Sequence, residues 1–109
     1  MNARVKARWL KALRSGRYKQ ATGALRVGDG YCCLGVLCDL ARKSQVGEWE
    51  YTEEFDGESG ELPPSVVAWA GLPGPDPEVM DKRHPRTLSD LNDRGANFER
   101  IAALIEKGL

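Results

Sequence analysis

The sequence is poor in the residues on which secreted proteins and many enzymes depend. Its 109 residues include only three cysteines and one histidine. Because three thiols cannot all pair within one chain, and because reduced cysteines are typical of the cytoplasm, we expect a cytoplasmic protein. No run approaches the roughly 20 apolar residues that a membrane-spanning helix needs. Charges interrupt residues 1–17 every two or three positions, so we expect neither a signal peptide nor export.

Motifs of common enzyme chemistry are also missing. The sequence contains no GxxxxGKS/T phosphate loop, no GxGxxG dinucleotide loop, no GxSxG nucleophile elbow and no HExxH zinc helix. The adjacent carboxylates of Glu53 and Glu54 lie in a polar stretch that predicts solvent exposure, whereas a general acid needs partial burial. We therefore predict a protein that is not an enzyme and that needs no cofactor.

The three cysteines are close together in the sequence, at Cys32, Cys33 and Cys38. Structural zinc sites use pairs of ligands two to four residues apart with a second pair elsewhere, and the single histidine, His84, lies far along the chain among prolines and arginines. Cysteine is also one of the residues most often fully buried. We expect core thiols and no metal site; a metal ligand or a reactive thiol is the weaker alternative.

The formal net charge of zero conceals a strong segregation of charge. Residues 1–28 carry eight basic and no acidic residues (+8), residues 29–62 carry two basic and nine acidic (−7), and residues 63–109 carry six basic and seven acidic (−1). A surface of one sign concentrates ligands of the opposite sign, which favours an anionic partner for the basic part. The alternative is that the two blocks neutralise each other, either within the fold or across a dimer interface.

One basic segment, residues 14–26, has the composition of a nucleotide-binding surface. Arginine and lysine side chains bind phosphate, a tyrosine ring stacks on a base, and amide and hydroxyl groups bond to a base edge or a sugar. The candidate ligand-binding residues are Arg14, Arg17, Tyr18, Lys19, Gln20, Thr22 and Arg26. The alternative is that the segment is a helix end followed by an exposed strand.

Hydrophobic periodicity and capping signals predict an α+β fold in a single domain over residues 1–109, with about four helices and a short antiparallel hairpin or small sheet. Apolar residues recur at helical spacing in residues 4–14, 31–43 and 97–105. Pro63 and Pro64 predict the start of a short helix that Gly71 ends, and Thr87 and Asn97 predict the caps of two others. The segment 31–43 is predicted to be the central buried helix.

The remaining segments carry strand or turn signals. Residues 17–27 predict a β-hairpin or two short strands before a turn at residues 28–30. Alternation over residues 48–52 predicts a strand with Trp49 and Tyr51 on its buried face. Residues 56–60 predict a mobile polar loop, and four prolines over residues 73–85 predict an irregular connection.

The C-terminal segment 87–109 has the outline of a helix-turn-helix, since two helices are joined by a turn that contains glycine. The second helix carries Glu99 and Glu106, which phosphate groups would repel. We therefore expect a packed helical hairpin, and this pair of helices argues against duplex nucleic acid as a partner.

The segment from Leu13 to Ala41 resembles a family of short, uncharacterised proteins encoded by bacteriophages and prophages. The family is marked by an LRSG-x-Y-x-Q-x-x-G-x-L pattern that runs into CCLGVLCDLA, and both are present here. The similarity continues more weakly through residues 62–66, 69–72 and 88–105. The resemblance implies a phage protein in the cytoplasm of an infected bacterium, and it assigns no catalytic residues.

That setting implies a function, because small phage proteins without enzymatic motifs often act against host defence. We expect a protein that sequesters a phosphorylated nucleotide immune signal, of the cyclic oligonucleotide or ADP-ribose type, without turnover. Tight binding of such a ligand predicts an enclosed pocket, and a homo-oligomer would supply one between protomers. Two alternatives stay open: a module that binds a host protein through its acidic or basic surface, and a small DNA-binding regulator.

Overall fold

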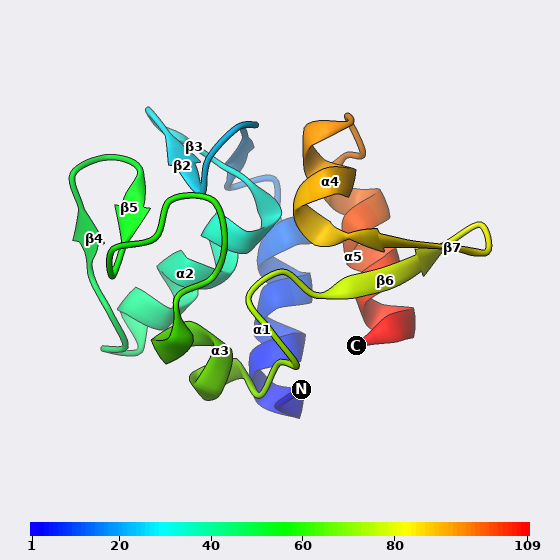
Figure 1. Ribbon diagram of the computed structural model, residues 1–109, viewed down its shortest axis with the longest axis horizontal. Helices are drawn as coiled ribbons and strands as arrows, with labels where there is room; N and C mark the ends of the chain where they lie inside the picture. The colour runs from blue at the N-terminus through cyan, green and yellow to red at the C-terminus, as the bar shows by residue number, and fades with distance from the viewer.

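Five helices and seven short strands follow one another in the computed structural model, which describes residues 1–109 (Figure 1). The helices are α1 (Ala3–Arg14), α2 (Cys33–Lys43), α3 (Pro64–Ala70), α4 (Leu88–Asp93) and α5 (Phe98–Gly108). The strands are β1 (Lys19–Gln20), β2 (Arg26–Val27), β3 (Gly30–Tyr31), β4 (Trp49–Glu50), β5 (Glu54–Phe55), β6 (Glu78–Asp81) and β7 (His84–Thr87). The predicted α+β domain is confirmed.

Helix α2 is the centre of the structure, as predicted. Every residue from Cys33 to Ala41 is buried, and α1, α3 and α4 all pack against this helix. The helix begins with Cys32 as its N-cap, whose sulfur accepts a hydrogen bond from the backbone N–H of Gly35 at 3.4 Å. Helix α5 packs against α1 and α4 and buries its own apolar face. The C-terminal helices therefore form the predicted packed pair.

The predicted helix boundaries are confirmed where a side chain or a glycine sets them. Thr87 and Asn97 cap α4 and α5 by accepting hydrogen bonds from the backbone N–H groups of Asp90 and Arg100. Helix α3 ends at Gly71, which adopts the left-handed conformation at φ 66°. None of the helices is long and apolar enough to span a membrane.

The first sheet has the order β1-β3-β2. Two strands lie within residues 17–27, as predicted, but they do not pair with each other: β1 runs parallel to β3, and β2 runs antiparallel to it. The turn at Gly28 therefore joins β2 to β3, and Tyr31 belongs to a strand rather than to the start of α2. Backbone pairing between distant residues decides this arrangement, and local alternation does not reveal it.

The predicted burial of Tyr51 is wrong. The strand ends at Glu50, and Tyr51 lies in a turn at φ 57° with 89% of its surface exposed. Phe55 is fully buried instead and contacts Trp49 edge-on, with 5.0 Å between ring centroids. The polar segment after it is a hydrogen-bonded turn, because Phe55 and Glu58 exchange two backbone bonds. The chain reverses here, and the reversal brings the next aromatic residue inward.

The predicted irregular connection at residues 73–85 is also wrong, because its second half is part of an antiparallel hairpin. Strands β6 and β7 pair from Glu78 opposite Thr87 to Asp81 opposite His84. Three of the four prolines precede the hairpin, and Pro85 occupies a position in a two-stranded sheet, where each strand has a free edge that needs no N–H donor. Val79 is buried under α5, and this contact holds the hairpin against the domain.

Candidate functional site

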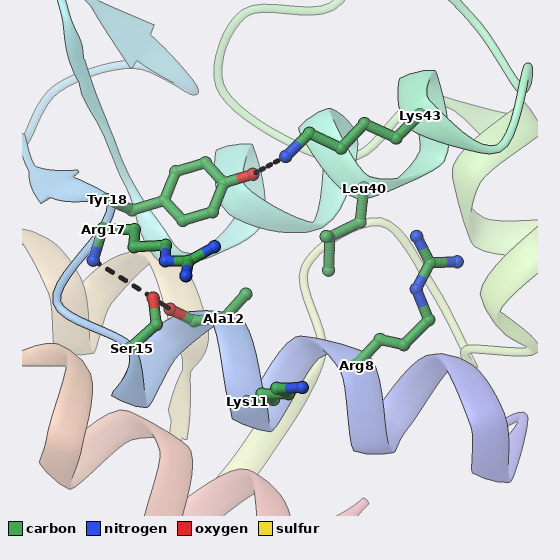
Figure 2. Close-up of a pocket in the computed structure, with 8 residues that line it drawn as sticks. All are labelled: Arg8, Lys11, Ala12, Ser15, Arg17, Tyr18, Leu40 and Lys43. Atoms are coloured by element: carbon green, nitrogen blue, oxygen red, sulfur yellow. Dashed lines mark hydrogen bonds between the residues drawn. The ribbon is translucent and has the colours of Figure 1, made fainter.

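An open basic groove of about 470 Å³ lies between α1, α2 and the segment that joins α1 to β1 (Figure 2). It is lined by Arg8, Lys11, Ala12, Ser15, Arg17, Tyr18, Leu40 and Lys43. Four of these eight residues are cationic and none is acidic. The groove therefore attracts anions, and the side chains of Ala12 and Leu40 give it an apolar floor.

Helix α1 and the turn after it place three of the cations. Arg8, Lys11 and Ser15 follow one another at helical spacing along one side of α1. Ser15 ends the helix: its hydroxyl donates to the carbonyl of Ala12 at 2.7 Å and accepts from the backbone N–H of Arg17 at 3.1 Å. Gly16 adopts φ 74°, which reverses the chain so that Arg17 lies over the groove.

Tyr18 forms a fixed wall of the groove. Its hydroxyl donates to Asp39 Oδ2 at 2.7 Å and accepts from Lys43 Nζ at 3.3 Å (Figure 2), and its ring meets Tyr31 edge-on at 5.1 Å. Burial and the hydrogen bond to Asp39 raise the pKa of Tyr18, so the phenol stays a neutral donor. The ring is therefore oriented before any ligand arrives.

Asp39 is the buried anion that orients this wall. It is 5% exposed and accepts hydrogen bonds from Tyr18, from Arg42 Nε at 3.0 Å and from Trp49 Nε1 at 3.2 Å. Burial by itself raises the pKa of Asp39, but the three donors lower it further than burial raises it. The carboxylate is therefore stabilised in its charged form. It attracts Lys43, whose Nζ lies 3.8 Å from Asp39 Oδ2 beside the groove.

Asp39 should make the free energy of unfolding depend on pH in the acidic range. Because its pKa is lowered in the folded state, its contribution is fully present above the ordinary aspartate value of about 4 and is lost as the pH falls through the folded value. We expect Asp39→Asn to cost about 2 kcal/mol at neutral pH and to flatten the loss of stability below pH 4. Urea unfolding followed across this pH range measures both effects.

The exposed carboxylate of Asp29 provides the control for this experiment. Asp29→Asn removes an acid that pairs only with Lys19 at the surface, so its acid response should match that of the unaltered protein. An Asp39→Asn variant with an unchanged acid response would contradict the assigned role of Asp39.

The structure brings only two of the seven predicted ligand residues, Arg17 and Tyr18, into the groove. Arg14 points to α5, where it pairs with Glu106 at 3.1 Å. Lys19 pairs with Asp29 at the surface. The five residues outside the groove are therefore no part of this site.

Gln20, Thr22 and Arg26 also lie away from the groove. Gln20 donates from its side-chain amide to Asn92 Oδ1 at 2.9 Å and to the carbonyl of Ala96 at 2.8 Å, which is a structural role. Thr22 is exposed. Arg26 is held between the rings of Tyr31 and Trp49, 5.4 Å from each centroid.

Three cations of the groove, Arg8, Lys11 and Lys43, are not among the ligand-binding residues predicted from the sequence. The first two carry a signal in the sequence, because they share a helix face with Ser15 that the apolar residues of α1 leave free. Lys43 carries no such signal, since its place depends on how α2 packs against α1. Only the pair Lys19 and Asp29 joins the basic block to the acidic residues 29–62 in an ion pair within the chain.

The three cysteines lie in the core, as predicted. Burial raises the pKa of Cys32 to about 11 and raises those of Cys33 and Cys38 as well. The Cys33 thiol donates to the carbonyl of Leu88 at 3.5 Å. All three are therefore neutral thiols that pack rather than react.

The fold and the groove define a small single-domain α+β protein with a preformed anion-attracting surface. The chain belongs to the family described as a domain of unknown function (DUF8296), whose model matches residues 1–109. Comparisons with curated proteins and with solved structures find no match.

Proposed function

We propose that the protein binds a small phosphorylated nucleotide in the basic groove and holds it without turnover. The observation that carries the proposal is the lining itself, four cations and no carboxylate around one hollow of about 470 Å³. Arg8, Lys11 and Arg17 form no ion pair with any residue of the chain, so their charges are not neutralised. Arg8 donates one hydrogen bond, from Nη1 to the Ser44 hydroxyl at 2.9 Å, and keeps its other N–H groups for a ligand. The size lies within the range of small-molecule sites.

Each lining group has a role in this proposal. Arg8 and Arg17 bind phosphate oxygens through two N–H groups each, and Lys11 adds a point charge. The sugar or base rests on the apolar floor and against the ring of Tyr18. Lys43 lies beside Tyr18 and closes the end of the groove nearest α2.

The chemistry of the lining supports retention of the ligand rather than its cleavage. No histidine, thiol or carboxylate lines the groove, and the Ser15 hydroxyl is already engaged in the turn by two hydrogen bonds. The phage setting implied by the sequence resemblance favours a nucleotide immune signal as the ligand. The groove is open to solvent within one chain, in contrast to the enclosed pocket expected from the sequence, so a ligand with several phosphates should bind best.

A thermal-shift and calorimetry panel of cyclic di- and trinucleotides, ADP-ribose derivatives and mononucleotides tests the proposal. One class should stabilise the protein by about 2.7 kcal/mol at a hundredfold excess over Kd, or roughly 10 °C. The groove variant, Lys11→Gln with Arg17→Gln, removes two side chains that contact nothing charged and should weaken binding roughly 100-fold. The ligand released by denaturing the protein should be chemically intact.

A variant with the same change in charge elsewhere provides the control. Lys82→Gln with Arg83→Gln lies on the β6–β7 hairpin, outside the groove, and should leave the affinity unchanged. The absence of any shift across the panel would contradict the proposal and favour a protein partner. Equal losses in the two variants would show that binding follows overall charge rather than the groove.

A further inference from the structure

The β6–β7 hairpin projects beyond α4 and α5 (Figure 1), and its tip carries several basic residues. Within residues 82–86 the sequence is Lys-Arg-His-Pro-Arg. No carboxylate lies within ion-pair distance of Lys82, Arg83 or Arg86. The hairpin therefore presents free positive charge at a distance from the α1–α2 groove.

The backbone at the tip is strained at the same two cationic residues. Lys82 and Arg83 form the two-residue turn and adopt φ 50° and 75°. Such turns strongly favour Asn-Gly or Gly-Gly, because both central residues need the left-handed region. Strain of this kind tends to persist at functional positions. Lysine and arginine at this turn therefore favour a role for their side chains.

The base of the hairpin is anchored, so the tip is held in a defined position. Both carboxylate oxygens of Asp81 lie 2.6 Å from Arg100 Nη2 on α5, and Val79 is buried beneath the same helix. This ion pair occupies the carboxylate closest to the tip. The remaining cations are free to meet an external anion.

A groove of about 590 Å³ lies between the hairpin and the C-terminal end of α5. Lys82, Arg83 and Lys107 line it together with the apolar side chains of Met80 and Leu104, and Glu78, at the far end of β6 from the tip, is its one acidic residue. Met80 is 58% exposed. Cations beside an apolar floor suit a sugar–phosphate chain, because phosphates meet the cations while the sugars contact the floor.

We propose that this hairpin docks on the phosphate backbone of double-helical DNA. A two-stranded ribbon fits the wide major groove of B-form DNA. Residues 78–87 contain no phenylalanine, tyrosine or tryptophan, and His84 is their one aromatic ring, so the hairpin lacks the series of rings on which successive bases of a single strand stack. Its turn also lacks the apolar residues that a membrane-inserting tip would carry. The hairpin makes the contact, and α5, with Glu99 and Glu106, does not enter the groove.

Fluorescence anisotropy with a labelled DNA duplex of about 20 base pairs tests the proposal on the full chain. We expect micromolar binding at about 50 mM salt that weakens steeply as salt is added. Four phosphate contacts, from Lys82, Arg83, Arg86 and Lys107, predict a slope of log K against log salt of about −3.6. No detectable binding at low salt would overturn the proposal.

The tip variant, Lys82→Asn with Arg83→Gly, separates charge from folding. Asn-Gly suits the turn better than Lys-Arg, so its melting temperature should be equal or higher. Its affinity for the duplex should fall at least roughly 10-fold, and its salt slope should be smaller in magnitude by about 1.8. A tip variant that melts normally and binds the duplex as tightly as the unaltered protein would contradict the proposal.

The groove variant, Lys11→Gln with Arg17→Gln, is the matched control, because it removes two positive charges from the α1–α2 groove and leaves the hairpin unchanged. It should bind the duplex as the unaltered protein does, while the tip variant should keep the nucleotide affinity of the α1–α2 groove. Equal losses in both variants would point to net charge and overturn the proposal. Stronger binding to a single strand of the same length, or to vesicles with anionic lipid, would also overturn it.

Discussion

Replacing Gly35 with alanine should destabilise the native fold more than any other single change described for this protein. A Cβ atom at this position would lie 1.8 Å from the carbonyl oxygen of Leu25 and 2.7 Å from its carbonyl carbon. Both atoms belong to the backbone, so no rotation of a side chain relieves the overlap. Leu25 is held in place by backbone hydrogen bonds to Ser59 and Cys32. The cost should therefore exceed the ordinary overpacking range and reach about 4 kcal/mol or more.

Circular dichroism and urea unfolding measure this effect. The unfolding free energy of a domain this size is about 5 to 15 kcal/mol, so Gly35→Ala should be largely unfolded or strongly shifted in midpoint. Gly60→Ala is the matched control, because a Cβ there has no atom within 4 Å and its φ is not in the left-handed region; its change should stay within about 0.5 kcal/mol. A Gly35→Ala midpoint equal to that of Gly60→Ala would refute the close crossing of α2 and the chain at Leu25.

Asn92→Leu should produce the second large loss of stability, about 3 to 5 kcal/mol. The Asn92 side chain is fully buried. Its oxygen accepts from Gln20 Nε2 at 2.9 Å and from the backbone N–H of Cys33 at 3.1 Å, and its nitrogen donates to the carbonyl of Ala21 at 2.8 Å. A leucine of similar size removes one hydrogen bond each from the Gln20 amide, the Cys33 N–H and the Ala21 carbonyl. Each polar group left without a partner costs about 1 to 3 kcal/mol.

A double-mutant cycle with Gln20 tests whether the loss comes from this network. Gln20→Ala should destabilise the unaltered protein by about 1 to 2 kcal/mol and the Asn92→Leu variant by less, because one of the two partners of Gln20 is already gone and only the Ala96 carbonyl remains. Urea midpoints of the four proteins give the coupling. Fully additive losses would be inconsistent with a shared network.

These contacts explain why the segment from Leu13 to Ala41 has its particular residues. Tyr18 bonds to Asp39, Gln20 bonds to Asn92, and Leu25 lies against Gly35. Several residues that give this segment the composition of a nucleotide-binding surface therefore form the hydrogen bonds that join the small sheet to α2 and α4. Among them, Arg17 combines a place in the groove with a side chain that pairs with nothing in the chain.

The helices were predictable because their signals are local. The apolar stripe of α1, the caps Thr87 and Asn97, and the ending of α3 at Gly71 each depend on neighbours within one or two turns. Two aromatic positions near β4 were not predictable in the same way. Alternation indicates a strand but does not reveal where the strand ends. The sequence therefore predicts a buried Tyr51, whereas Phe55 is the aromatic residue that is buried.

The β6–β7 hairpin shows the same limit for turns. Pro85 argues against a strand, and Lys82-Arg83 is not a usual pair for a tight turn. Its anchoring by Val79 and by the Asp81–Arg100 pair comes from α5, about twenty residues further along the chain. Contacts between distant residues therefore supply what local preference does not.

By itself, the sequence determined the fold class, the helices, the buried cysteines and the concentration of positive charge in residues 1–28, because composition and short-range periodicity encode them. The tertiary structure alone decided which cations meet. It separates Arg14 and Lys19 into ion pairs and brings Lys43 from α2 to Arg17 and Tyr18. The physical reason is that the direction of a side chain follows from the packing of whole elements, and helix packing joins residues that no spacing in the sequence connects.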